Sequence, residues 1–138
     1  MDDQQPDLHG MLADLFSPYG IAEHARVAVR GDDMTIAPRA ATPLALVFHE
    51  LATNSAKYGA LSAEHGSVDL SIADEGNFLL LHWVEHGGPP AKPDSKEGFG
   101  SRLVEMSVTG QLAGSWERRF EEDGMVCDLR VSKTAISV

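Results

Sequence analysis

The run from Phe48 to Gly59 constrains the fold of this chain more than any other, because a helix separates its polar and apolar residues onto different faces. Glu50, Asn54 and Lys57 stand at helical spacing and therefore share one face. The apolar residues of this region form a second stripe that can pack on a sheet: Leu44, Val47, Phe48, Leu51 and Tyr58. The sequence thus predicts an amphipathic helix that keeps three polar groups together on one side.

The chemistry of this polar face suits a metal ion beside phosphate. The amide carbonyl of Asn54 and the carboxylate of Glu50 are hard oxygen ligands of the kind that Mg²⁺ prefers. The ammonium of Lys57 is a point charge suited to phosphate. The alternative is a solvated helix surface on which these residues bind nothing. The remaining segments of the chain favour the first interpretation.

Length and charge limit the classes of function. A chain of 138 residues, 43% of them hydrophobic, suits one domain with its own core. The formal net charge of −10 argues against a nucleic acid or a membrane surface as partner, because both are bound by basic surfaces. No apolar run approaches the length of a membrane span, and the N-terminus is acidic, which predicts a cytoplasmic chain. Cys127 is the only cysteine, and its alternating surroundings predict a buried side chain.

Alternating runs predict a sheet beside the helix. Residues 26–30 and 34–37 are expected as a strand pair joined by a turn, residues 68–72 and 78–84 as a hairpin, and residues 115–121 and 125–131 as a second hairpin. Helices are expected at residues 7–17, 39–58 and 99–109, with Pro43 in a first turn and Gly59 as a C-cap. Helices on one face of a mixed, mostly antiparallel sheet make an α+β two-layer sandwich.

Two further segments carry ligand-binding chemistry. In Trp83-Val84-Glu85-His86-Gly87-Gly88, a carboxylate ends an apolar strand, where it can accept from a ligand amino group, and the glycines let the backbone approach that ligand. In Gly98-Phe99-Gly100-Ser101-Arg102-Leu103, a Gly-x-Gly opens a helix whose N–H groups can bind phosphate. This motif lacks the preceding strand of a dinucleotide-binding fold, and we therefore reject that fold for this chain. An ordinary strand end and ordinary loop glycines are the alternatives.

The order of these segments resembles a known family. It is similar to the ATP-binding domain, of the Bergerat fold, that histidine kinases share with gyrase, the Hsp90 chaperones and MutL-type ATPases. More narrowly, His49-Glu50-Leu51-Ala52-Thr53-Asn54-Ser55-Ala56-Lys57-Tyr58-Gly59-Ala60-Leu61-Ser62 with Trp83-x-Glu85 resembles the bacterial HWE histidine kinases. The resemblance covers roughly residues 25–131. It implies a connecting segment with a short helix at residues 1–22 and a catalytic ATP-binding domain at residues 23–138.

The resemblance implies a role for each polar residue of the helix. Asn54 takes the place of the Mg²⁺-ligating asparagine, and Glu50 assists as a base or through a metal-bound water. Lys57 would contact phosphate, and Tyr58 would border the nucleotide. His49 is implied as a catalytic residue that poises the phosphate or orients Glu50. The commoner role of such a histidine is a satisfied position in the core or behind the metal site.

The same resemblance implies how ATP or ADP would be held with Mg²⁺. Glu85 takes the place of the aspartate that usually reads the adenine amino group, and Gly87 and Gly88 would bring backbone to the base. Trp83 is expected first as an apolar wall of the adenine pocket and second as a stacking partner. Six residues would close on the phosphates: Gly98, Phe99, Gly100, Ser101, Arg102 and Leu103. The breaker-rich loop at residues 87–98 would be a mobile lid that orders on nucleotide binding.

No segment resembles the two-helix dimerisation unit that carries the phosphoacceptor histidine. The resemblance therefore implies the catalytic part of a larger sensor kinase, whose partners are that dimerisation domain and, indirectly, a response regulator. Two alternatives stay open: a non-catalytic ATP-sensing (pseudokinase) module, and a standalone ATPase or serine kinase on the same fold. The complete polar face of the helix argues against the first. The signature of His49 and Trp83-x-Glu85 argues against the second.

Overall fold

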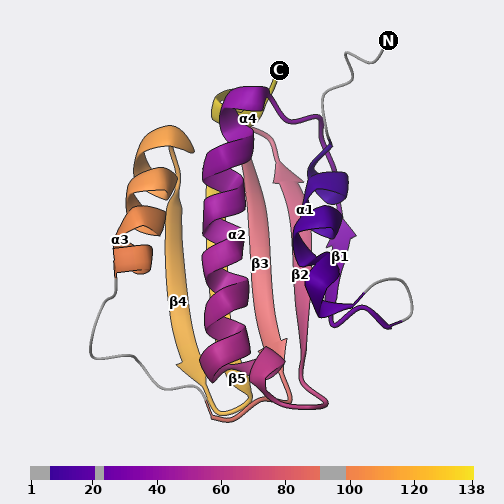
Figure 1. Cartoon of the computed structure of the whole chain (residues 1–138). Coiled ribbons are helices and arrows are strands. Elements are labelled where there is room, and N and C mark those ends of the chain that lie inside the picture. The colour runs from indigo at the N-terminus through magenta and orange to yellow at the C-terminus, as the bar shows by residue number, and fades with distance from the viewer. Residues whose placement is uncertain (1–6, 21–23, 91–98) are drawn as a thin grey trace.

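Five strands form one mixed sheet in the computed structural model, which describes residues 7–20, 24–90 and 99–138 (Figure 1). In chain order they are β1 Val27–Gly31, β2 Ser67–Glu75, β3 Phe78–His86, β4 Ser115–Glu121 and β5 Gly124–Ser132. Across the sheet their order is β1-β2-β3-β5-β4. β1 runs parallel to β2, and the other neighbouring pairs are antiparallel. The predicted mixed, mostly antiparallel sheet is confirmed.

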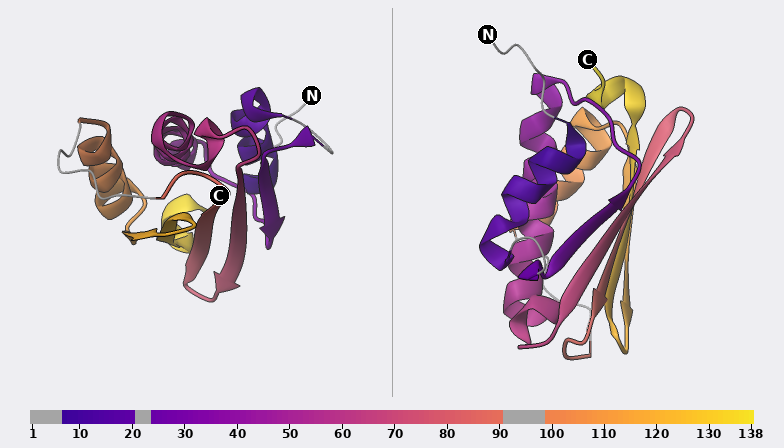
Figure 2. Two further views of the ribbon diagram at one scale, coloured as in Figure 1. Left: turned by 90° about the horizontal axis from the view of Figure 1, so that it is seen from below. Right: turned by 90° about the vertical axis from the view of Figure 1, so that its right-hand side faces the viewer.

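The three main helices lie together on one face of this sheet (Figure 2). They are α1 Leu8–Phe16, α2 Pro38–Tyr58 and α3 Phe99–Met106, and α3 continues into a wider turn, η4 Ser107–Gln111. Short helical turns follow α1 and α2, namely η1 Ser17–Tyr19 and η3 Ala60–Ser62. A last helix, α4 Lys133–Ile136, follows β5 and was not predicted. The two layers confirm the predicted α+β sandwich.

The core lies between α2 and the strands, and period-2 alternation explains it. The residues that the central strands bury toward the helices include Leu70, Ile72, Leu79, Leu81, Trp83, Cys127, Leu129 and Val131, and α2 adds Leu44, Val47, Phe48 and Leu51. Three rings join the layers, since Phe16 of α1 lies 5.8 Å from Trp83 and 6.2 Å from Phe48 between ring centroids. Cys127 is buried, as predicted. α1 therefore shares one core with α2 and β3.

Pro43 lies inside α2, and the prediction that it would stand in a first turn is wrong. The helix begins at Pro38, which occupies the first helical position that proline favours, so Pro43 falls in the second turn. Pro43 has no N–H to donate to the carbonyl four residues earlier. Its ring is buried, and apolar burial offsets the missing hydrogen bond. At the other end, Gly59 is the C-cap, as predicted.

The predicted strand pair at residues 26–30 and 34–37 is also wrong in its second member. β1 pairs instead with β2, and the N–H of Asp32 continues that ladder by donating to the carbonyl of Ile72 across 2.8 Å. The chain then leaves the sheet. Thr35 and Ile36 form isolated bridges with Asp7 and Ser137, which are distant in sequence. Long-range pairing therefore replaced the local turn that the alternation indicated.

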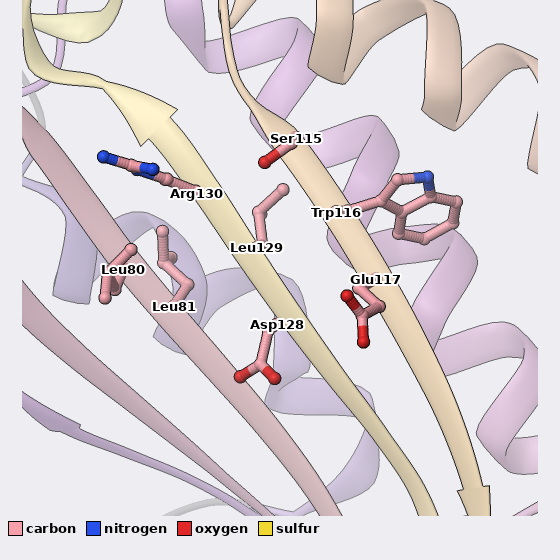
Figure 3. A pocket seen from close by; sticks show the side chains of 8 residues that line it. All are labelled: Leu80, Leu81, Ser115, Trp116, Glu117, Asp128, Leu129 and Arg130. Carbon is pink, nitrogen blue, oxygen red and sulfur yellow. The ribbon is translucent and has the colours of Figure 1, made fainter.

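The opposite face of the sheet carries polar side chains. Asp128 alternates with the buried residues of β5, and it pairs there with His82 and with Arg119, whose Nη1 lies 2.6 Å from Oδ2. Figure 3 shows the side chains that line a hollow over β3, β5 and β4, among them Leu80, Glu117 and Asp128. Because α2 covers the other face, this hollow is separate from the predicted nucleotide site.

Among the described residues, no helix is long and apolar enough to cross a bilayer.

Candidate functional site

The polar face of α2 holds an amide and a carboxylate in contact. Nδ2 of Asn54 donates to Oε2 of Glu50 across 3.1 Å, one helical turn away. Both side chains are partly exposed, and Lys57 is exposed further along the helix. Because the amide nitrogen faces Glu50, the carbonyl oxygen lies on the other arm of the amide. A carboxylate and an amide carbonyl, two hard oxygen donors that suit Mg²⁺, therefore belong to adjoining side chains.

Glu85, at the end of β3, is a buried carboxylate on which three donors converge. The residue is only 3% exposed. Its Oε1 accepts from the hydroxyl of Ser55 and from the N–H of Ala60, each across 2.9 Å. Its Oε2 accepts from the indole Nε1–H of Trp83 across 3.0 Å. The donors come from α2, η3 and β3, so this one carboxylate ties the helix layer to the sheet.

The three donors leave part of the hydrogen-bonding capacity of the Glu85 carboxylate unused. A carboxylate offers about four acceptor positions and no donor when ionised. Among the described residues, two positions of Oε1 and one of Oε2 on Glu85 are filled. One acceptor position of Oε2 remains for a ligand. A group that donates a single hydrogen bond, such as the amino group of a purine, matches that position.

Ser55 connects this cradle to the polar face of α2. Asn54 and Ser55 are neighbours in sequence, yet the first bonds to Glu50 and the second to Glu85. Ser55 is buried and also accepts the N–H of Leu61 across 3.1 Å. A single turn of α2 therefore serves an oxygen site suited to metal on one side and an acceptor suited to a base on the other.

Two glycines are required by close approach at this site. A Cβ on Gly59 would lie 2.1 Å from Oε1 of Glu85, and a Cβ on Gly88 would lie 2.5 Å from Cα of Ala60. Both distances are far below normal contact, so any side chain would push the strand end away from η3. Gly59 therefore ends α2 without the left-handed backbone common at C-caps, and its lack of a side chain admits Glu85.

Arg26 fixes the loop that supplies one of these donors. Its guanidinium donates to the carbonyls of Ala60, Leu61, Ala63 and Gly66, with Nη2 2.8 Å from Gly66 and 3.3 Å from Ala60. The planar fork of arginine can reach several carbonyls at once. The residues from Ala60 to Gly66 are thereby held against the start of β1. This restraint sets where the N–H of Ala60 meets Glu85.

Sequence comparisons relate the chain to sensor kinases. No family model matches the chain. It is 35% identical over 123 residues to a blue-light-activated histidine kinase of Brucella anthropi, spanning 86% of this chain and 25% of that protein. It is 35% identical over 127 residues to blue-light-activated histidine kinase 1 of Erythrobacter litoralis, spanning 90% of this chain and 35% of that protein. The chain thus covers about a quarter to a third of the length of these relatives.

Solved structures show the same fold. The EL346 blue-light activated histidine kinase of Erythrobacter litoralis matches with a TM-score of 0.71 at 20% identity, over 91% of this chain and 40% of that one. The catalytic domain of histidine kinase ThkA matches with a TM-score of 0.70 at 14% identity, over 96% of this chain and 98% of that one. The chain belongs to the HWE-type histidine kinases and has the fold of their catalytic domain.

This histidine kinase domain places the helix residues of its signature in different environments. Glu50 and Asn54 are in contact, while Lys57 is exposed. Tyr58 is 69% exposed, so the prediction that it packs on the sheet with the apolar stripe is wrong. His49 is exposed as well, so its expected position in the core is wrong. Residue 49 directly precedes Glu50 on α2 and follows the buried Phe48, which turns its side chain away from the sheet.

The residues predicted to close on phosphate lie at and just before the start of α3. Gly98 lies outside the described residues, as does most of the predicted lid of residues 87–98, from residue 91 onward. Phe99, Gly100 and Ser101 form the start of α3, as the Gly-x-Gly motif predicted, and their side chains lie outside the description. Arg102 is exposed and Leu103 is partly buried. Among the described residues, no group of three or more His, Cys, Asp or Glu side chains is placed so that it could hold a metal ion.

Sequence reasoning missed the residues that hold Glu85 in the kinase domain. Ser55 left a readable signal, because it continues the apolar stripe of α2 one turn after Leu51 and is a polar residue on a buried face. Trp83 was expected as a wall of the pocket, whereas its ring belongs to the core and its N–H serves Glu85. Ala60 and Arg26 act through backbone groups and a distant loop, which no local pattern indicates.

Proposed function

We propose that this chain binds ATP with Mg²⁺ and provides the catalytic domain of a two-component sensor kinase, passing a phosphoryl group to a histidine of a dimerisation domain. The observation that carries the proposal is the shared turn of α2, where Asn54 bonds to Glu50 and Ser55 bonds to Glu85. One turn thus joins an oxygen site for metal to an acceptor for adenine. The relatives named as histidine kinases support the same activity.

The residues fit these ligands by their chemistry. Asn54 and Glu50 would hold Mg²⁺, and Lys57 would approach phosphate. Glu85 would receive the adenine amino group at its remaining acceptor position. When bound, ATP supplies the phosphoryl group and Mg²⁺ neutralises the charge of its phosphates. The protein's own contribution is to position and orient these groups, which is the main lever of phosphoryl-transfer enzymes.

The assignments of Tyr58, Gly87, Gly88 and the start of α3 to the nucleotide site are part of this proposal. So is a cytoplasmic location. The boundary between a connecting segment at residues 1–22 and a catalytic domain at residues 23–138 is also proposed, although α1 packs into the domain core through Leu8, Leu12 and Phe16. A response regulator is an indirect partner in the proposal; one similar structure is ThkA in complex with the response regulator TrrA.

Phosphotransfer to a supplied acceptor tests the proposal. The chain is incubated with radiolabelled ATP, alone and with the dimerisation domain of its parent protein. We expect acid-labile, alkali-stable label on the dimerisation domain and none on the chain alone, because His49 is fixed on α2 and cannot be delivered in line with the phosphate. Asn54→Ala should abolish the label. Label on a histidine of the chain itself would overturn the assignment of the acceptor to a separate domain, whereas ATP binding without any transfer would refute the kinase assignment and indicate an ATP-sensing module.

A further inference from the structure

The Trp83–Glu85 contact is built into the strand and into the core. The two residues alternate on β3, so both point toward the helices. Trp83 is 1% exposed, and its ring lies 5.8 Å from Phe16 and 6.4 Å from Phe48 between centroids. Packing from two helices therefore fixes the direction of the indole N–H, which meets Oε2 of Glu85 at 3.0 Å. A rigid donor of this kind holds a carboxylate in one orientation.

Orientation decides which oxygen can reach a ligand. Oε1 of Glu85 is filled by Ser55 and Ala60, so a ligand amino group has only Oε2 to approach. Trp83 takes one acceptor position of Oε2 and leaves the other. Without the indole N–H, only the two donors on Oε1 would hold the carboxylate, and Oε2 could tilt about the last bond, so that its remaining position would be less sharply directed. The contact thus selects one direction of hydrogen bonding for the ligand.

We propose that Trp83 is a positioning residue for purine selectivity: its indole N–H orients Oε2 of Glu85, so that this oxygen accepts from a purine 6-amino group and rejects a 6-carbonyl. The inference rests on the proposed nucleotide binding and deepens it. It explains why a tryptophan stands two residues before the acid, since phenylalanine would fill much of the same core volume without a donor. Trp83 acts through Glu85 and touches no reacting atom.

Paired nucleotides separate this role from a general effect on folding. The dissociation constants of ADP and inosine diphosphate, which differ in the 6-amino or 6-carbonyl group and in the proton that the carbonyl form carries on N1, are measured for the unsubstituted chain, for Trp83→Phe and for Trp116→Phe. Trp116 is the matched control, because it lies on β4, two strands away from β3 with its Trp83 and Glu85. The guanidinium of Arg118 lies 4.9 Å from the centroid of its ring. We expect Trp83→Phe to lower the preference for ADP by about tenfold, the value of one modest hydrogen bond. Trp116→Phe should preserve the preference.

The measured dissociation constants distinguish a failure of the inference from a failure of the proposed function. Equal weakening of both nucleotides by Trp83→Phe would overturn the inference, because a merely structural role would leave their ratio unchanged. If the unsubstituted chain binds neither nucleotide, the proposed function fails, and the inference fails with it. Binding with an unchanged ratio refutes the inference alone.

A spectroscopic test covers the case in which Trp83→Phe does not fold. The chain has two tryptophans, so Trp116→Phe leaves one indole N–H resonance, that of Trp83. With ¹⁵N labelling, we expect this resonance to shift when ADP saturates the protein and to shift less with inosine diphosphate. It should also move upfield on Glu85→Asp, since the shorter acid cannot reach the indole in the same way. A resonance that does not respond to saturating ADP would overturn the inference.

Discussion

Asn54 and Glu50 form a hydrogen bond of 3.1 Å along one turn of α2, with the amide nitrogen as donor and Oε2 as acceptor. This contact sets which arm of the Asn54 amide would face the proposed Mg²⁺, and it places an acid beside that arm. Two of the three polar residues that the sequence placed on one face of α2 are therefore hydrogen-bonded to each other.

Removing the amide should reduce the effect of magnesium on nucleotide binding. Asn54→Ala deletes a carbonyl ligand, and even outer-shell partners of metals are worth roughly 10–100-fold in affinity, so we expect at least about a tenfold loss of the Mg²⁺-dependent affinity for ATP. Affinity without metal should change little. Calorimetry with and without Mg²⁺ measures both. Asn77→Ala, at the exposed turn between β2 and β3, is the matched control and should bind like the unsubstituted chain.

Truncating Glu85 should weaken both binding and folding. Glu85→Ala leaves the donors of Ser55, Ala60 and Trp83 without their acceptor, and each unsatisfied buried group costs about 1–3 kcal/mol unless water replaces the partner. We expect the free energy of unfolding in denaturant to fall by at least about 2 kcal/mol. Glu64→Ala, at an exposed position, should leave it nearly unchanged. An unaltered stability would contradict the three-donor cradle.

Selectivity for ATP over GTP should also depend on Glu85. An acceptor that faces the guanine carbonyl loses a hydrogen bond and gains repulsion, a penalty of about 1–3 kcal/mol. The unsubstituted chain should therefore prefer ATP by roughly 5–150-fold in competition binding. Equal affinity for the two nucleotides would remove Glu85 from the role of base reader, whatever its role in folding.

Arg26, which directly precedes β1, should matter far more to stability than Arg30 on that strand. Arg26→Ala removes the donors to the carbonyls of the loop from Ala60 to Gly66, so we expect a loss of about 1–3 kcal/mol in stability and faster amide exchange in that loop. Arg26→Lys should restore only part, because an ammonium lacks the planar fork. Arg30→Ala removes an exposed ion pair with Asp69 and should cost less than about 1 kcal/mol. Equal effects at both positions would contradict the clamp.

The thiol of Cys127 should be inert in the folded chain. Burial raises its pKa to about 12. The folded thiol therefore stays protonated at alkaline pH while the unfolded one ionises near its ordinary pKa of about 8.5. The buried thiol therefore contributes to the free energy of unfolding in full below the unfolded pKa, and this contribution is lost as the pH rises toward about 12. A thiol reagent at pH 8 should react only after denaturation, and Cys127→Ala should flatten the alkaline loss of stability. Rapid reaction of the native chain would contradict its burial.

The sequence predicted the parts of the fold that depend on local periodicity. The alternation in β2, β3 and β5 and the apolar stripe of α2 placed these elements close to their observed bounds. Pairing with distant partners was not predicted: the strand at β1 was expected, but it pairs with β2 in place of the segment that follows it, and only the folded chain brings β1 and β2 together. α4 was missed for another reason, because a single turn is too short to give a periodic signal.

The same distinction applies to the candidate site. Glu50 and Asn54 are neighbours on one helix, so their contact followed from spacing. The environment of Glu85 combines Ser55 from α2 with the backbone of Ala60, and their approach requires Gly59 to lack a side chain. Such convergence carries no periodic signal. The resemblance to histidine kinases indicated that Trp83 and Glu85 belong to the site, and the structure adds that they are joined by a hydrogen bond.

Titration of the chain with ATP in a calorimeter, once with Mg²⁺ and once with a chelator, tests the central claim most directly. The account predicts saturable one-to-one binding that strengthens by at least about tenfold with the metal, because Asn54 and Glu50 supply its ligands beside Lys57. Absence of binding under both conditions, or binding of equal strength with and without Mg²⁺, would contradict it.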